Sequence, residues 1–484
     1  MIHLKKGLVP FWSDHLIDTR FTDAVLSANK PEKRDTVLVC DRPYEGDGTD
    51  FFTVLKDDDC YRMYYEGWGL RDKPFNIRLC YAESRDGIHW EKPNLGLVEY
   101  DGNKDNNIIF EKLPDNFTVM KDANPACPPE MRYKAVGSIK DITPNEVNDG
   151  KSRVALQLWV SADGIHFEKR EIISRGYAYD TQNTLHWNRH TGKYYCYIRG
   201  YHDAPADPTG RLEETSVRDI LVMESEDCQN WSEPKPLYFG GEDYPLYTNC
   251  ISPYLYDDRY YIGFPSRYVQ RSEWTKNYDR LCGAEKRKDR MVGLGGPRLG
   301  LAVTDCVFMS SQDNYNWYRF DEAIMTPGIE YGENWVYGDC FPAVGSPVET
   351  QSPYKNNPPE LSMYVFTHHW MDSPVELVRY VYRRDGFASV KAGYQKKKLI
   401  TKPFTFEGGT LKLNFSTSAR GGIYLRILDE NNIPIEGYST CEIFGDSLDR
   451  IIDFDAPLSA LNGKAVKFEF TMSDAEIFSM TFED

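Results

Sequence analysis

The sequence predicts an all-β protein: a five-bladed β-propeller followed by a C-terminal β-sandwich. Three observations lead to this prediction. A short hairpin motif recurs at intervals suited to propeller blades, patterns with helical periodicity are nearly absent, and the character of the sequence changes near Lys396. The chain of 484 residues is also too long for one ordinary domain.

The recurring motif is a turn of the type Ser-x-Asp-Gly with an aromatic residue shortly after it. Its copies centre on Asp86, Asp163, Asp227 and Asp313 and, in degenerate form, on Asp385, at intervals of 77, 64, 86 and 72 residues. Each copy follows an apolar strand, and the Asp-Gly type of turn then forms a tight hairpin with the next strand. Five copies predict five blades. The alternative is a large irregular β-sandwich in which these turns recur by coincidence.

We expect three regions along the chain. Residues 1–36 form an N-terminal segment that packs on the propeller, residues 37–392 form the propeller, and residues 393–484 form a sandwich or jelly roll of short strands. The longest interval between motif copies contains residues 269–298, which are rich in charge and glycine. We interpret them as an insertion in the fourth blade that forms a lid, an oligomer contact or a solvated loop.

Composition limits the partners that this chain can have. A net charge of −17 argues against nucleic acid, whose binding needs a surplus of basic residues. No apolar run is long enough to span a membrane, and the N-terminus lacks the apolar core of a signal peptide. The 11 cysteines form no Cys-x-x-Cys pair, which favours reduced thiols. We therefore expect a cytoplasmic protein; whether it forms a homo-oligomer remains open.

Aromatic residues are abundant, with 33 Tyr, 24 Phe and 10 Trp. Most are explained by packing between strands, but flat apolar rings also cover the C–H faces of sugars, so a saccharide is the expected substrate. No zinc, phosphate-loop, serine-hydrolase or dinucleotide motif is present, and no cofactor is expected. A structural divalent cation on the propeller axis is an alternative that no ligand motif supports.

Carboxylates recur at the places where the innermost strand of each blade should begin. Such positions meet at one mouth of a propeller. The catalytic candidates are Glu45, Asp47, Asp122, Asp180 and Glu333, with Asp50 as a further acid of the first blade. Cleavage of a glycosidic bond needs one carboxyl group as proton donor and another as base or nucleophile. The alternative is that these residues cap turns through side-chain hydrogen bonds.

Further polar and aromatic residues near the expected mouth could bind substrate. These candidates are Asn183, Arg199, Asn249, Arg267, Asp305, Trp335, Asp339 and His368. The arginines, together with Arg218, could orient a substrate or lower the pKa of neighbouring carboxyl groups. The pair His368-His369 could equally be ordinary strand packing.

Several segments resemble a known group of proteins. The stretch Tyr81–Gly96, followed by Asn106–Ile108, is similar to bacterial proteins that resemble the N-terminal domain of glycoside hydrolase family 32. Segments Tyr179–Asn183, Leu246–Asn249 and Glu333–Val336 are also similar, and the resemblance covers nearly the whole chain. It implies kinship with the five-bladed propeller clan of families 32, 43, 62 and 68, whose members hold three acidic groups around the axis.

By position, the resemblance implies a role for each acid. The nucleophile or base would be Glu45, Asp47 or Asp50, the transition-state stabiliser Asp122 and the general acid Asp180. The Trp-Met-Asn-Asp-Pro-Asn-Gly and Glu-Cys-Pro elements of fructan hydrolases are absent. Aspartate in place of glutamate at the acid position also shortens its reach by one methylene, which matters for catalysis. The sugar, the linkage and the stereochemical outcome are therefore not implied.

The leading hypothesis is an enzyme that cleaves or transfers a glycosyl unit, such as a furanosyl unit, with axial Asp and Glu residues as general acid and base or nucleophile. The alternative is a propeller that binds carbohydrate without cleaving it. A third hypothesis, phosphorolysis, needs a cluster of Arg, Lys and His at the axis.

Overall fold

The computed structural model describes residues 1–484 except 73–75, 112–114, 141–153, 204–215, 294–295 and 331–332. The chain forms two compact units, one of residues 32–381 and the other of residues 1–31 together with 382–484. Strands dominate both, and the two α-helices of the described residues are α1 (Ala284–Gly293) and α2 (Arg298–Leu301). Neither has the length and apolar character needed to cross a membrane, nor has any other described helix.

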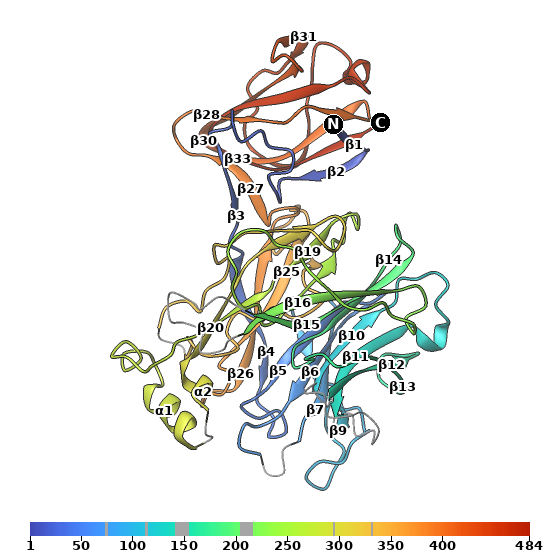
Figure 1. The fold of residues 1–484 in the computed structure, drawn as a ribbon, viewed down its shortest axis with the longest axis vertical. Helices are drawn as coiled ribbons and strands as arrows, with labels where there is room; N and C mark the ends of the chain where they lie inside the picture. The colour runs from blue at the N-terminus through green and yellow to red at the C-terminus, as the bar shows by residue number, and fades with distance from the viewer. Residues whose placement is uncertain (73–75, 112–114, 141–153, 204–215, 294–295, 331–332) are drawn as a thin grey trace. The chain divides into compact units, whose positions relative to one another are not determined.

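Residues 32–381 form the predicted five-bladed propeller (Figure 1). Each blade is a sheet of antiparallel strands, in these orders from the axis outward: β5 (Asp50–Lys56), β6 (Tyr61–Gly67), β7 (Arg78–Ser84) and β8 (Trp90–Glu91), with β9 (Ile108–Glu111) also on β7; β10 (Asp115–Lys121), β11 (Tyr133–Lys140), β12 (Val154–Ser161) and β13 (Glu168–Arg175); β14 (Thr184–Asn188), β15 (Lys193–Asp203), β16 (Ser216–Ser225) and β17 (Lys235–Pro236); β18 (Ser252–Pro253), β19 (Tyr261–Gly263), β22 (Met309–Ser311) and β23 (Trp317–Arg319); β24 (Val348–Thr350), β25 (Glu360–Thr367), β26 (Val375–Tyr382) and β4 (Glu32–Cys40). Contacts join the innermost strands in series: β24 with β5, β5 with β10, β10 with β14 and β14 with β18.

The fifth blade is completed by a strand from the start of the chain. Strand β4 pairs antiparallel with β26, from Cys40 opposite Val375 to Glu32 opposite Val381, and the two lie side by side in Figure 1. The expected boundary between residues 36 and 37 therefore falls inside a strand. Sequence patterns missed this because β4 is largely exposed and charged in its first half.

The fourth blade carries the insertion expected at residues 269–298. Strands β20 (Ser266–Gln270) and β21 (Ala302–Cys306) form a separate two-stranded ribbon, and the insertion connects them. It includes α1 and α2, which are drawn in yellow in Figure 1. Tyr278, Leu281 and Leu301 form a small buried core within it, so the insertion is a folded element.

The recurring turns join the third and fourth strands of the first four blades. In the first of them, the carboxylate of Asp86 accepts hydrogen bonds from the backbone N–H groups of Ile88 and His89, both at 2.8 Å. The turn also receives a tyrosine from a neighbouring blade, because the hydroxyl of Tyr364 donates to the carbonyl of Gly87 at 2.5 Å. The same contact joins Tyr64 of the first blade to Gly164 of the second, at 2.9 Å. The motif therefore links blades as well as strands.

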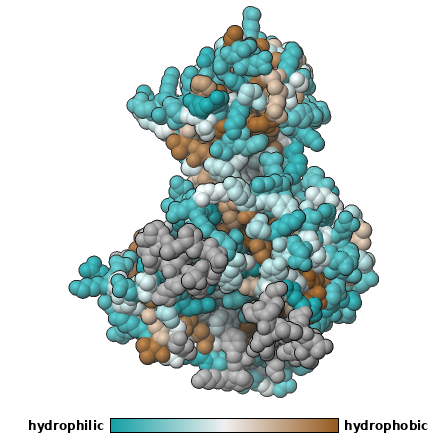
Figure 2. Space-filling view, viewed as in Figure 1, coloured by the Kyte–Doolittle hydropathy of each residue, from teal (hydrophilic) through white to brown (hydrophobic). Residues whose placement is uncertain are grey.

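Most aromatic residues fill the spaces between blades. One core cluster combines Tyr64 and Tyr81 of the first blade with Phe117 and Tyr133 of the second, and further clusters join the blades that follow. Another contains Phe52 of the first blade together with residues of the fifth. This is the strand packing that the composition predicted. On the face shown in Figure 2, hydrophilic residues cover most of the surface.

The second unit is built on a ten-stranded sheet around two long strands, β30 (Thr410–Asp429) and β33 (Val466–Glu483). The N-terminal strands β1 (Ile2–Leu4), β2 (Gly7–Pro10) and β3 (Val25–Ala28) belong to it, pairing respectively with β29 (Phe404–Phe406), β33 and β27 (Ala388–Ala392). Its remaining strands are β28 (Lys397–Ile400), β31 (Pro434–Ser439) and β32 (Asp446–Ile451). Residues 1–31 thus complete this sheet, whereas we expected residues 1–36 to pack on the propeller. A sandwich arrangement of this unit stays a prediction.

Candidate active site

Two blades begin with the same four-residue pattern, Asp-x-Phe-Thr. It reads Asp50-Phe51-Phe52-Thr53 in β5 and Asp115-Asn116-Phe117-Thr118 in β10. In both, the second residue has a positive φ (48° for Phe51 and 63° for Asn116), and the register to the next strand shifts directly after the aspartate. Such a bulge re-aims the first side chain of a strand, so the two aspartates take equivalent places at one mouth of the propeller.

The two aspartates meet through a third carboxyl group, that of Glu66. Asp50 stands directly opposite Glu66 in the pairing of β5 with β6, and Asp115 lies close enough for its charge to act on the carboxyl group of Glu66. Oε1 of Glu66 accepts a hydrogen bond from the backbone N–H of Phe117 at 2.7 Å. The indole N–H of Trp68 donates to Asp50 Oδ1 at 3.1 Å. Asp50 and Glu66 are 4% and 0% exposed, so this cluster is buried.

Burial favours the neutral form of these acids. Removal from water, reinforced by the charges of Asp115 and Asp180, raises the pKa of Asp50 well above its usual value. Burial, followed by the charges of Asp115 and Asp50, raises the pKa of Glu66 well above its usual value. The pKa of Asp115 rises to about 6, mainly through burial and then through the charge of Asp180. The site therefore holds carboxyl groups that retain protons near neutral pH, as acid–base catalysis requires.

Asp180 lies beside this cluster and faces solvent. It precedes β14, the innermost strand of the third blade, and its side chain is 64% exposed. Nη1 of Arg199 lies 3.7 Å from its Oδ2, and Arg199 itself is held by Nη2 donating to the carbonyl of Tyr247 at 2.9 Å. Asp180 is thus the carboxylate at this mouth that a substrate can reach most directly.

Aromatic rings and arginines form the wall next to Asp180. The ring of Tyr247 stacks on Tyr268, with centroids 5.7 Å apart, and meets Tyr337 edge to face at 5.3 Å. The guanidinium of Arg199 lies 4.2 Å from the centroid of Tyr247, and that of Arg218 lies 4.4 Å from Tyr268. Such a wall offers both apolar faces and positive charge to a ligand.

Two of the predicted binding residues are structural groups under this wall. Asn249 accepts hydrogen bonds from the hydroxyl of Thr184 and the backbone of Ile251, and it donates to the carbonyl of Gln182. Asn183 is fully buried and donates to the carbonyls of residues 179 and 181. Both hold the ends of the innermost strands in place.

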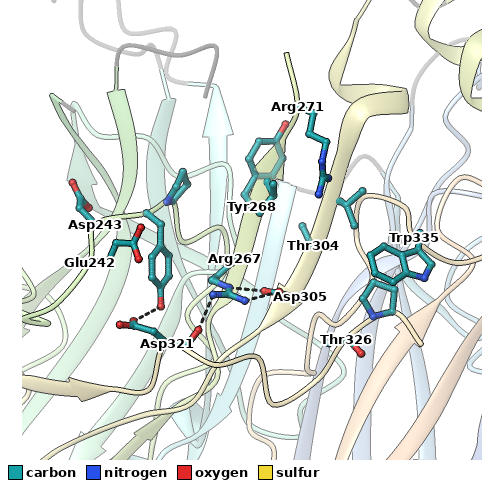
Figure 3. Close-up of a pocket in the computed structure, with 15 residues that line it drawn as sticks. Glu242, Asp243, Arg267, Tyr268, Arg271, Thr304, Asp305, Asp321, Thr326 and Trp335 are labelled. Carbon is teal, nitrogen blue, oxygen red and sulfur yellow. Dashed lines mark hydrogen bonds and ion pairs between the residues drawn. The ribbon is translucent and has the colours of Figure 1, made fainter. Parts of the chain in front are cut away.

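A concavity of about 380 Å³ opens beside the wall (Figure 3). Arg267 and Tyr268 of the ribbon strand β20 line it, together with Arg271 directly after that strand and Trp335 from another loop. Arg267 forms a two-pronged ion pair with Asp305, at 2.7 and 2.6 Å. Three of the predicted binding residues, Arg267, Asp305 and Trp335, therefore lie together here, and Tyr268 separates them from Tyr247.

Asp122 does not lie with Asp50, Asp115 and Asp180. It follows the last residue of β10, at the strand end opposite Asp115, and seven strand residues span about 20 Å. Its buried carboxylate pairs with Lys134 and accepts a hydrogen bond from the hydroxyl of Tyr194 at 2.7 Å. Asp122 was predicted to stand at the start of an innermost strand, but the strand that follows it, β11, is the second strand of its blade. That shift by one strand moved the expected acid to the wrong end.

The other first-blade candidates have structural partners. Glu45 is fully buried, accepts a hydrogen bond from the hydroxyl of Tyr65 at 2.6 Å and forms an ion pair with Lys92 at 2.7 Å. Asp47 accepts a hydrogen bond from the backbone N–H of Leu70 at 2.8 Å. Of the three first-blade acids that the sequence left open, Asp50 alone joins the buried cluster with Glu66.

The fifth-blade candidates are spread over two loops. Glu333 accepts a hydrogen bond from the backbone N–H of Ser373 at 2.9 Å. Asp339 is 2% exposed and accepts from the N–H of Val336, and burial raises its pKa to about 7. His368 lies near the carbonyl of Pro374 at 3.1 Å. Its neighbour His369 is the buried one, and desolvation lowers its pKa to about 3, so it is neutral.

The insertion packs on the loops of this mouth. Arg287 of α1 donates to the carbonyl of Asn334 at 3.0 Å, and Arg290 donates to the carbonyl of Trp370. Asp289 forms an ion pair with Arg71 of the first blade. The insertion also supplies Arg298, whose guanidinium lies 5.2 Å from the centroid of Tyr337. These contacts favour the interpretation of the insertion as a lid over those of an oligomer contact or a solvated loop.

Sequence reasoning missed Asp115, Glu66 and Arg298. The signal for Asp115 was present, because aligning the starts of the blades gives the pattern Asp-x-Phe-Thr twice. Glu66 lies in β6, the second strand of its blade, so only its pairing with Asp50 shows that it belongs to the site. In the part of the chain that the structure describes, no group of three or more His, Cys, Asp or Glu side chains is arranged to hold a metal ion.

Comparisons with known proteins find likeness in solved structures. No family model matches the chain, and no curated protein matches it. An N-acetylgalactosamine deacetylase from F. plautii in complex with blood group B trisaccharide is 12% identical, with 74% of this chain and 96% of that one covered and a TM-score of 0.45. A structure from the GH130 family of mannoside phosphorylases is 14% identical, with 80% and 99% covered and a TM-score of 0.41. A family 43 arabinoxylan arabinofuranohydrolase from Bacillus subtilis is 8% identical, with 94% and 99% covered and a TM-score of 0.29.

Proposed function

We propose that the protein is a glycosidase that cleaves or transfers a glycosyl unit at the propeller mouth, with Asp50 and Asp180 as the two acting carboxyl groups. The observation that carries this proposal is the placement of a buried, proton-retaining acid cluster next to an exposed carboxylate. Two carboxyl groups in different environments are what acid–base cleavage of a glycosidic bond needs.

The resemblance found in the sequence assigns the base or nucleophile to the first blade and the general acid to the third. We transfer these roles to Asp50 and Asp180. Because the pKa of Asp50 is raised, Asp50 acts as a base only at pH values high enough to remove its proton, so activity should increase as pH rises through that pKa. Asp115 then takes the place that the sequence had given to Asp122, that of the stabilising acid.

The first experiment measures product release from a broad panel of aryl glycosides and oligosaccharides, furanosides included, with Asp180→Asn as the paired variant. We expect release by the natural chain and a loss of about 10²- to 10⁴-fold in the variant on substrates with poor leaving groups. If neither protein releases sugar while one saccharide binds both equally, hydrolysis is refuted in favour of a carbohydrate-binding propeller.

Leaving-group dependence separates the two roles. A donor variant keeps most of its activity on aryl glycosides whose leaving group needs no proton, whereas a variant of the base or nucleophile does not. We therefore expect Asp180→Asn to retain activity on dinitrophenyl glycosides and Asp50→Asn to lose it. The opposite pattern would exchange the two roles.

A further inference from the structure

Two arginines approach the region around Asp180 from different elements. Arg199 lies in β15 of the third blade, and Arg298 begins α2 of the insertion. Their guanidinium groups lie over Tyr247 and Tyr337, at 4.2 and 5.2 Å from the ring centroids. The two rings are themselves only 5.3 Å apart, so both positive charges reach the same wall of the mouth.

Asp180 is a carboxylate whose charge acts on both arginines, but it pairs closely with neither. Among the described residues, the ion pair of Arg199 with Asp180 is long, at 3.7 Å, and Arg298 has no ion pair. Arg199 is 2% exposed, and its Nε has no hydrogen-bond partner in the described part of the chain. A buried guanidinium N–H without an acceptor is costly, so an oxygen supplied by a ligand would lower that cost.

Asp180 offsets one of the two positive charges, and the other nearby acids do not offset the second. Asp50 and Glu66 are buried, and burial favours their protonated forms. The chain as a whole carries a net charge of −17, so a positively charged wall at the axis runs against its overall balance. Guanidinium groups recognise planar oxyanions through paired N–H donors.

We propose that Arg199 and Arg298 form an oxyanion subsite beside Asp180, and that the glycosyl substrate carries a carboxylate, as a hexuronate does. This inference rests on the proposed function and specifies its substrate class. Orthophosphate offers the same chemistry from another source. In that case a phosphate oxygen bonds to the anomeric carbon as the glycosidic C–O bond breaks, and the proton of the general acid passes to the leaving oxygen.

Calorimetric titration of the full chain at low ionic strength tests the subsite without requiring turnover. The probes are D-glucuronate, D-galacturonate and orthophosphate, with D-glucose and D-galactose as neutral counterparts. We expect an acidic sugar to bind at least about ten times more tightly than its neutral counterpart, and Arg199→Gln or Arg298→Gln to weaken it about 10- to 100-fold. Arg259→Gln is the matched control, because Arg259 pairs with Asp257 in the turn between β18 and β19.

Each outcome is decisive. Equal binding of acidic and neutral sugars, unchanged in both arginine variants, overturns the subsite. Arginine-dependent binding of orthophosphate alone supports the oxyanion subsite and overturns the substrate carboxylate. Arginine-dependent binding without any turnover supports the subsite and refutes the proposed function. Turnover of neutral glycosides without oxyanion binding supports the proposed function and overturns the subsite. Arg199 is buried, so the half-buried Arg298 provides the test if Arg199→Gln does not fold.

Discussion

Asp50 and Asp115 occupy the same position in neighbouring blades, each as the first residue of an innermost strand and each followed by a residue with positive φ. Glu66 stands opposite Asp50 in the sheet, and the charges of both aspartates act on it. Two acids that are 65 residues apart in sequence thereby share one buried cluster. Crowding of this kind is what keeps protons on carboxyl groups at neutral pH.

Asp50→Asn and Asp122→Asn separate catalysis from stability. Asp50→Asn should lower kcat by at least about 100-fold, because it removes the proposed base. Asp122→Asn should leave kcat close to that of the natural chain but reduce the free energy of unfolding by about 3 kcal/mol, because Lys134 is then buried without a carboxylate. Steady-state kinetics and urea unfolding measure the two effects. A large kcat loss in Asp122→Asn with unchanged stability would restore Asp122 as a catalytic candidate.

Glu66→Gln should stabilise the protein at neutral and alkaline pH. The folded-state pKa of Glu66 lies above its unfolded value, so the natural chain loses stability as pH rises from about 4 towards the folded pKa. Glutamine cannot ionise, and its side-chain oxygen can still accept from Phe117. We expect the variant to gain at least about 1 kcal/mol at pH 8 and almost nothing at pH 4. Thermal unfolding over this pH range checks the trend, and a gain that is independent of pH would contradict it.

Asp115→Asn should move the acidic limb of kcat/KM to lower pH. The charge of Asp115 raises the pKa of Asp50, so its removal lets Asp50 lose its proton earlier as pH increases. The natural chain should also show the ionisation of Asp115 itself near pH 6, and the variant should lack it. A pH–rate profile of both proteins measures the shift. An unchanged acidic limb would separate Asp115 from the acting acid.

Gly164→Ala should weaken the contact between the first two blades. Gly164 has a φ of +76°, and a Cβ there would lie 2.8 Å from the hydroxyl of Tyr64. We expect a loss of about 2 kcal/mol in the free energy of unfolding, from backbone strain and displacement of Tyr64. Gly192→Ala is the control: its φ of +67° gives similar strain, but nothing lies within 4 Å of the added Cβ. Equal losses in the two variants would show that the tyrosine contact contributes nothing.

The repeat predicted the propeller because each turn is a local structure that its own residues determine. Asp86 and its equivalents make these hydrogen bonds within a few residues, so they leave a pattern in the sequence. The fifth copy, at Asp385, is degenerate for a structural reason. The chain leaves the propeller after β26 and never returns for a fourth strand, since β4 already occupies that place.

The site was predictable only in part, because it depends on which strand of each blade is innermost. Asp180 precedes a strand that the sequence identified correctly, and it lies at the mouth. Asp122 was assigned through the second strand of its blade and therefore lies at the far end of β10. Glu66 and Arg298 depend on partners that are distant in sequence, and no local pattern distinguishes such residues from surface charges.

The pairing of β4 with β26 has a consequence for synthesis of the chain. Glu32 can pair with Val381, and complete the fifth sheet, only after Val381 has been synthesised. Leu8 likewise pairs with Thr481, which follows it by 473 residues. The first forty residues therefore emerge from the ribosome long before the strands that pair with them have been synthesised. During translation these edges stay unpaired, and loop-closure entropy makes such distant pairing slow. Newly made chains are thus most exposed to aggregation before the last strands emerge, and a chaperone that shields the N-terminal segment would help most at that stage.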